Sequence, residues 1–193
     1  EVEEVMQPYF CEKYGNPSGI YKMASECRQA LETVRKQIGE TLKVSAQEIY
    51  FTSGGTESDN WAIKSTAQRL KEKGKHIITS KIEHHAVLNS CAYLETQGFE
   101  VTYLDVDEWG CVRFDALQRA IRKDTILISI MYANNEVGTI QPIEQIGKIA
   151  KENDIFFHTD AVQAYGQLLI DVKKENIDLL SASAHKFNGP KGV

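Results

Sequence analysis

The chain has 193 residues, 42% of them hydrophobic and 25% charged, which is typical of a globular protein with one sizeable core. Its formal net charge is -5 and the sequence shows no basic face, so we expect no nucleic-acid partner. No apolar run approaches the roughly 20 residues that cross a bilayer, and no signal-like segment is evident. We therefore expect no membrane partner and a cytoplasmic location, with an organelle matrix as the alternative.

Apolar periodicity predicts helices that alternate with strands. The expected helices cover residues 26–41, 57–72, 86–97, 115–122 and 143–152. The expected strands cover residues 76–80, 101–105, 125–131, 155–160 and 178–181. Near-continuous apolar strands separated by helices are typical of a mostly parallel sheet that is covered on both faces. The sequence therefore predicts an α/β fold of three layers, α/β/α, with residues 1–193 in a single domain.

A short apolar run at residues 49–51 also resembles a strand, and it leads into the glycine pair Gly54 and Gly55. The helix that follows begins with Thr56 and Glu57, so free backbone N–H groups and the positive end of the helix dipole would face one point. This arrangement predicts a phosphate site, although a plain tight turn is the alternative. A nucleotide is the less expected anion, because the segment has neither the P-loop nor the dinucleotide-binding pattern.

Two histidines, His84 and His85, stand at the start of the helix expected over 86–97. Adjacent helical residues point about 100° apart, so the pair is poorly placed to bind one metal ion. We expect one of them to act as a lone imidazole, which can stack on an aromatic cofactor and move protons near neutral pH. For His85, the preferred interpretation is a surface histidine that caps the helix.

Two further strands end in polar residues. The strand over 125–131 leads into Asn134, Asn135 and Glu136, which can orient a substrate or a phenolic oxygen, or can simply form a turn. The strand over 155–160 ends in Asp160, which can hold a proton on a pyridine nitrogen or, equally, cap a helix. Gln163 follows within reach of a ring substituent.

Lys186 follows the last apolar strand and stands beside His185 and a Gly-Pro turn. A lysine amine becomes a useful nucleophile toward an aldehyde when desolvation or a neighbouring cation favours its neutral form. Lys186 is therefore a candidate Schiff-base lysine. A solvated loop lysine is the alternative, and the other polar strand ends argue against it, because cofactor sites of open α/β sheets form where the strands end.

Together these motifs closely resemble the cysteine desulfurases of the NifS/IscS class, which are pyridoxal-phosphate enzymes of fold type I in the class-V aminotransferase family. The similarity runs from Tyr14 to the last residue. The matching motifs are Ser53-Gly54-Gly55-Thr56-Glu57-Ser58-Asp59-Asn60, Glu83-His84-His85-Ala86-Val87, Asn134-Asn135-Glu136-Val137-Gly138, Asp160-Ala161-Val162-Gln163 and Ser183-Ala184-His185-Lys186.

The resemblance implies roles for nine residues around pyridoxal 5'-phosphate. Lys186 would bind the cofactor covalently and move protons, and His84 would stack on the ring and assist proton transfer. Asp160 would pair with the pyridinium nitrogen. The cofactor phosphate would be held by Gly55, Thr56, Ser183 and His185. The phenolic side of the ring would be contacted by Gln163 and Asn135.

The implied reaction converts L-cysteine to L-alanine and transfers the sulfur to an enzyme cysteine as a persulfide, for iron–sulfur cluster or thio-cofactor biosynthesis. A sulfur-acceptor protein and a homodimer are implied as well. The chain has four cysteines, Cys11, Cys27, Cys91 and Cys111. None of them stands where the family keeps its sulfur-accepting thiol. The family's downstream substrate-binding arginine is also missing. We therefore expect a cofactor-binding large domain, truncated at both ends and inactive alone.

Alternative functions remain open for this sequence. A selenocysteine lyase or an aminotransferase-like enzyme would use the same lysine and aspartate, and a fragment without catalytic activity is a third possibility. The cysteines form no C-x-x-C pair, so neither a zinc site nor a disulfide framework is expected, and we expect no metal. Cys27 and Cys91 are expected to be buried free thiols in helices.

Overall fold

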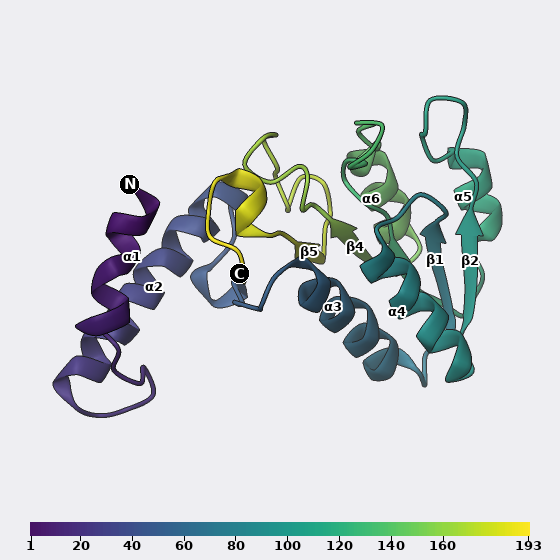
Figure 1. The fold of residues 1–193 in the computed structure, drawn as a ribbon. Helices are drawn as coiled ribbons and strands as arrows, with labels where there is room; N and C mark the ends of the chain where they lie inside the picture. Colours follow the sequence, from purple (N-terminus) through teal and green to yellow (C-terminus); the bar gives the residue numbers. More distant parts are fainter. The chain divides into compact units, whose positions relative to one another are not determined.

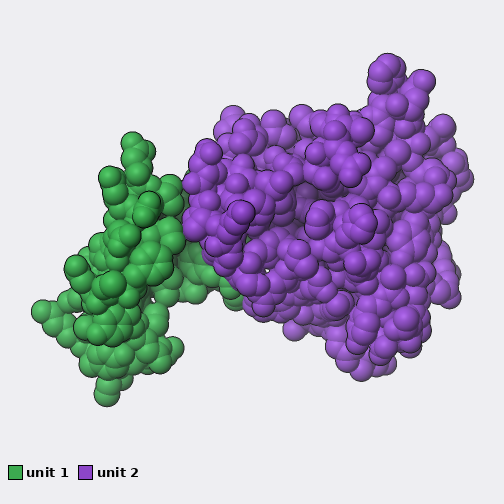
Figure 2. Space-filling view, in the orientation of Figure 1, with its two compact units in different colours: residues 1–51 green, residues 52–193 purple.

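The computed structural model describes residues 1–193. The chain forms two compact units, residues 1–51 and residues 52–193, which are coloured separately in Figure 2. No helix is both long and apolar enough to span a bilayer. The single domain expected over residues 1–193 stays a prediction.

The first unit is helical. It contains α1 (Val2–Cys11), α2 (Lys22–Leu42) and the 3-10 helix η1 (Ala46–Glu48). The helix expected over residues 26–41 is confirmed as part of α2, which ends at the left-handed residue Lys43. A capping box between Ser45 and Glu48 then starts η1, with the Ser45 N–H donating to the Glu48 carboxylate at 2.7 Å.

The strand suggested by residues 49–51 is wrong. These residues pair with no strand, and Tyr50 is 67% exposed. Three apolar residues are too few to specify a strand. Here the Phe51 ring instead lies under the Arg35 guanidinium, 5.4 Å from the ring centroid.

The second unit contains a five-stranded parallel sheet in the order β2-β1-β3-β4-β5. Its strands are β1 (His76–Ser80), β2 (Glu100–Leu104), β3 (Thr125–Ser129), β4 (Phe156–Asp160) and β5 (Leu179–Ser181). Its helices are α3 (Gly55–Leu70), α4 (His85–Thr96), α5 (Phe114–Ala120), α6 (Ile143–Glu152) and the 3-10 helix η2 (Ala184–Phe187). The five strands and four α-helices predicted for this unit are confirmed, with ends that shift by a few residues.

The strand order places helices on both faces of the sheet. The chain moves from β1 to β2 in one direction and then returns past β1 to β3 and β4. Right-handed crossovers therefore put α4 on one face and α5 and α6 on the other. Helix α3 packs against α4, and Figure 1 shows these two helices together in front of the strands. The three-layer α/β/α architecture is confirmed. The order in which strands are added to the sheet reverses between β1 and β3.

Burial explains why the central strands read as continuous apolar runs. Every residue of β1 and β3 is buried. One core cluster forms between the sheet and the helices α3 and α4, and it includes Ile63, Ile77, Val87, Leu94 and Leu127. The polar His76 is accommodated in β1 because its two ring nitrogens pair with the hydroxyl groups of Thr125 and Thr102, at 2.7 and 2.8 Å.

Candidate functional site

A cavity of about 230 Å³ opens where the strands β1, β3, β4 and β5 end. All nine residues singled out in the sequence line it: Gly55, Thr56, His84, Asn135, Asp160, Gln163, Ser183, His185 and Lys186. Four lining residues were not foreseen: Asp59, Met131, Ala133 and Val162. The fold thus brings separate segments of the second unit to the topological switch point between β1 and β3, where the strand order reverses. Ligands bind at this point in open α/β folds.

One end of the cavity is formed by the start of α3. Gly54 precedes the helix with φ 132° and ψ -179°, a conformation open essentially to glycine alone. A Cβ on Gly55 would lie 2.7 Å from the Val162 Cγ2 atom, so the second glycine keeps the approach to the helix open. The Ser183 hydroxyl lies beside this turn, 2.9 Å from the His185 Nδ1 atom.

This end fits a phosphate group. The first N–H groups of α3 have no partner within the helix, and the helix dipole adds positive potential there. Glu57 does not oppose an anion from inside the cavity, because it is not among the lining residues and its carboxylate turns back to accept the Ser53 N–H at 2.5 Å. That backbone hydrogen bond lowers the pKa of Glu57.

Asp160 ends β4 and presents a buried carboxyl group to the cavity. Its Oδ1 atom accepts the Val162 N–H at 3.0 Å, so the aspartate also has the local capping role considered from the sequence. Burial raises the pKa of Asp160, while the hydrogen bond from Val162 and the facing His84 favour the ionised form. Gln163 lies in the turn that follows.

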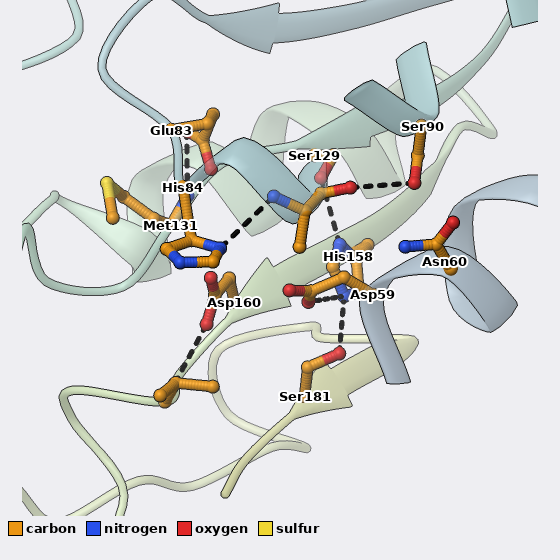
Figure 3. Close-up of polar contacts among 12 residues, drawn as sticks. Asp59, Asn60, Glu83, His84, Ser90, Ser129, Met131, His158, Asp160 and Ser181 are labelled. Atoms are coloured by element: carbon orange, nitrogen blue, oxygen red, sulfur yellow. Dashed lines mark hydrogen bonds and ion pairs between the residues drawn. The ribbon is translucent and has the colours of Figure 1, made fainter. Parts of the chain in front are cut away.

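His84 is the N-cap of α4, and its Nδ1 atom accepts the Ala86 N–H at 3.1 Å. The neutral ring therefore carries its proton on Nε2. Figure 3 shows this ring facing the Asp160 carboxyl group. The expectation that His85 caps the helix is wrong. His85 is instead the first residue of α4 and is exposed, because only the residue before a helix can offer its side chain to the free N–H groups.

The neighbouring residues Asn134 and Asn135 also have different roles. Asn134 is buried and holds the loop after β3, because its Oδ1 atom accepts the N–H groups of Glu136 and Val137, each at 2.9 Å. Its Nδ2 atom donates to the Ile82 carbonyl at 3.0 Å. The turn interpretation therefore applies to Asn134, whereas Asn135 is exposed and lines the cavity.

Lys186 lies in η2 with an exposed side chain that has no hydrogen-bond or ion-pair partner. The turn around it is fixed on two sides. The Gly189 N–H donates to the Ala184 carbonyl at 2.8 Å, and the ring of Phe187 packs edge-on against Tyr165, with 5.0 Å between the ring centroids. An amine without a competing side-chain partner, on a fixed turn at the cavity, is suited to bind a small aldehyde.

Two buried carboxyl groups near the cavity were not predicted to have a role. Asp59 lies on α3 one turn after Gly55, a spacing that puts both on one helix face and could have identified it. Glu83 accepts the Ser80 hydroxyl at 2.6 Å and the Met131 N–H at 3.0 Å, so it joins the ends of β1 and β3. No sequence signal distinguishes Glu83 apart from its position before His84.

The ligand atoms of Asp59, His84 and Asp160 lie within 4.8 Å of one another. We assign none of them to a metal ion. Burial first and the charge of Asp160 second raise the pKa of Asp59 to about 8, which makes this carboxyl group a weaker metal ligand near neutral pH. The His84 Nδ1 atom is already used by the Ala86 N–H.

Comparisons with known proteins identify the family and the relatives of this chain. The aminotransferase class-V family model matches residues 1–193. "Cysteine desulfurase IscS" of Methanosarcina thermophila is 65% identical over 192 residues, which are 100% of this chain and 48% of that protein. "Cysteine desulfurase IscS" of Dictyoglomus turgidum is 59% identical over 193 residues, 100% of this chain and 49% of that protein. The chain therefore spans about half the length of the curated relatives it matches.

Solved structures show the same fold. "SspA in complex with cysteine" has a TM-score of 0.96 and 47% identity, covering 99% of this chain and 55% of that chain. A "NIFS-LIKE PROTEIN" has a TM-score of 0.95 and 44% identity, covering 99% of this chain and 53% of that chain. The parallel sheet is thus that of the fold-type-I pyridoxal-phosphate enzymes. The chain belongs to the aminotransferase class-V family.

Proposed function

We propose that this chain forms the cofactor-binding half of a pyridoxal-phosphate-dependent cysteine desulfurase, which converts L-cysteine to L-alanine and passes the sulfur to a protein thiol. The observation that carries the proposal is the single cavity lined by all nine residues identified from the sequence. The relatives named as cysteine desulfurases, and the related structure described as a complex with cysteine, support this choice of reaction and substrate.

The cavity offers a suitable partner for each part of pyridoxal 5'-phosphate. The start of α3, with Gly55, Thr56, Ser183 and His185, would hold the phosphate. Asp160 would hold the protonated ring nitrogen, and Gln163 and Asn135 would contact the phenolic side. When bound, the cofactor supplies an electron sink for the bond changes at the substrate's α-carbon.

The remaining roles belong to two side chains of the chain itself. Lys186 would hold the cofactor aldehyde and then, with its amine free, move a proton at Nζ. Its lack of a competing partner supports this role. His84 would cover one face of the ring. Because its Nδ1 atom is fixed by the Ala86 N–H, the proton that it can donate is the one on Nε2.

The wider setting follows from the same proposal. We infer that the protein works in the cytoplasm as a homodimer and delivers sulfur to an acceptor protein for iron–sulfur cluster or thio-cofactor synthesis. The relatives' shared name supports the sulfur-delivering part of this setting.

The test uses the full protein that contains this chain. With L-cysteine and pyridoxal phosphate present, we expect equal amounts of L-alanine and transferable sulfur, measured by amino-acid analysis and by sulfide release with a reductant. Lys186→Ala should abolish both products, whereas the matched control Lys191→Ala, at an exposed lysine in the following turn, should leave them unchanged. Full activity in Lys186→Ala, or turnover without alanine, would contradict the proposal.

A further inference from the structure

Asp59 is a buried acid that the proposed function leaves without a role. It is 1% exposed, yet it lines the cavity next to Asp160. We propose that Asp59 is a positioning residue for Asp160: it keeps a proton within the buried pair, so that the negative charge facing the cavity belongs to Asp160 alone. This inference rests on the proposed function, because Asp160 is the residue that would meet the cofactor's ring nitrogen.

The geometry makes the two acids a pair. Asp59 comes from α3 and Asp160 from the end of β4, and their carboxyl oxygens belong to a group whose ligand atoms lie within 4.8 Å of one another. Figure 3 shows Asp160 beneath the ring of His84 and Asp59 to one side of it, next to His158. Two carboxylates so close in a buried site cannot easily both be ionised, so the pair retains a proton near neutral pH.

The hydrogen bonds indicate which acid keeps the proton. The Asp160 Oδ1 atom accepts the Val162 N–H, and a hydrogen bond from an N–H group favours the ionised carboxylate. The Asp59 Oδ1 atom is fully buried and has no hydrogen-bond partner. An ionised oxygen left in that position would carry a large desolvation penalty, which a protonated carboxyl group avoids.

The nearest possible cation does not alter this assignment. The His158 Nε2 atom lies 3.6 Å from the Asp59 Oδ1 atom, but the His158 ring is fully buried between the hydroxyl groups of Ser129 and Ser181, at 2.9 and 3.1 Å. Burial lowers the pKa of His158 to about 3, so the ring is neutral and offers Asp59 no positive charge.

One neighbour acts in the opposite direction, because a hydrogen bond from the Ser181 side chain lowers the pKa of Asp59, but burial and the charge of Asp160 outweigh it. Helix α3 packs against α4, β3, β4 and β5. At the α4 side, the titratable groups that interact with the two acids are Glu83, which is itself a buried acid, and His84, which faces Asp160. Strands β3 and β5 contain no titratable residue, and β4 contributes His158 and Asp160. Lys186 and His185 line the same cavity. A proton on Asp59 therefore reduces the total negative charge of the three buried acids Asp59, Glu83 and Asp160.

The proton can be observed directly in the cofactor-free protein. We would label the aspartate side-chain carboxyl carbons with ¹³C, which leaves Glu83 silent, and record infrared and NMR spectra between pH 5 and pH 9, about the window set by the raised carboxyl pKa. We expect the C=O signal of one protonated aspartate at pH 7, lost in Asp59→Asn and retained in the matched control Asp178→Asn. An absent signal, or one that persists in Asp59→Asn, would overturn the proposal.

Cofactor-loaded protein gives the second readout. Because Asn mimics a neutral acid, Asp59→Asn should bind pyridoxal phosphate at pH 7 within about threefold of wild type, while Asp160→Asn binds at least about tenfold more weakly. Equal loss in both variants would mean that Asp59 carries charge, contrary to the proposal. If wild type takes up no cofactor, the proposed function fails, but the ¹³C signal still decides where the proton lies. If Asp59→Asn does not fold, the wild-type titration alone decides whether an aspartate stays protonated at pH 7.

Discussion

Adjacent residues of one motif have different tasks in this chain. Within Asn134 and Asn135, the first side chain holds the loop and the second faces the cavity. Within His84 and His85, the first caps α4 and lines the cavity, and the second is the first residue of the helix. The sequence indicates such pairs, but only the backbone path decides which member points inward.

The first prediction concerns the asparagine pair. Asn134→Ala should lower the free energy of unfolding by about 2 to 3 kcal/mol, because it removes three hydrogen bonds of a buried side chain, to two loop N–H groups and to the Ile82 carbonyl. Asn135→Ala, its matched control, should change stability by less than about 0.5 kcal/mol. Urea denaturation measures both. Equal losses in the two variants would contradict the assigned roles.

A second prediction follows from the buried acids. Burial raises the pKa of Asp59 and of Glu83 to about 8, so the folded chain holds protons that the unfolded chain has released above a pKa of about 4. Stability should therefore fall as the pH rises toward 8, by at most about 1.4 kcal/mol per pH unit for each acid. His158 has the opposite sign, with stability lost as the pH falls from 6.5 toward about 3.

The window from pH 7 to pH 8 separates these effects, because a histidine with the unfolded pKa of 6.5 is then mostly neutral. Urea denaturation across this window should show a decline for wild type and a shallower one for Asp59→Asn and for Glu83→Gln. The exposed control Glu72→Gln should keep the wild-type slope. A slope that neither buried variant changes would argue against protonated acids in the folded chain.

At the scale of elements, the start of α3 depends on two glycines for different reasons. Gly54 has a positive φ that other residues avoid, whereas Gly55 has a helical conformation and is limited by Val162. Gly54→Ala should therefore destabilise the chain by about 1 to 3 kcal/mol through backbone strain. Gly55→Ala should instead destabilise the chain through a steric clash, because its new Cβ would lie 2.7 Å from the Val162 Cγ2 atom.

A double-mutant cycle tests the glycine assignment. Combining Val162→Ala with Gly55→Ala should restore part of the stability lost in Gly55→Ala, because it removes the Cγ2 atom that the new Cβ would meet at 2.7 Å. The same change should give no relief to Gly54→Ala. Thermal melting of the three single variants and the two double variants checks this, and equal rescue of both glycine variants would show that the strain has another source.

Most elements could be predicted from the sequence because their apolar patterns are long or fully buried. The strand β1 was placed with its observed bounds, since all five residues are buried between neighbours. The strand predicted over residues 49–51 was wrong, because an isolated apolar run does not reveal whether a neighbouring strand is present to share its hydrogen bonds. The same limit hid the bond from the Met131 N–H to Glu83, which joins residues far apart in the sequence.

At the scale of the whole molecule, the sheet order creates the site. The order in which the strands are added reverses between β1 and β3. The end of β4 supplies Asp160, and the segments after β1, β3 and β5 bring His84, Asn135 and Lys186 to the same cavity. The sequence predicted these residues as a set because each follows an apolar strand, and parallel strands end at the same edge. It could not predict the buried pair of Asp59 and Asp160, whose closeness depends on how α3 packs on the sheet.

The central claim is that Lys186 is the residue that binds pyridoxal phosphate. The most direct measurement is to load the protein with pyridoxal phosphate, reduce it with borohydride to make a reversible lysine link permanent, and map the modified peptide by mass spectrometry. The account predicts one dominant modification at Lys186, the lysine that lines the cavity without a side-chain partner. Modification spread over surface lysines, or none at Lys186, would contradict it.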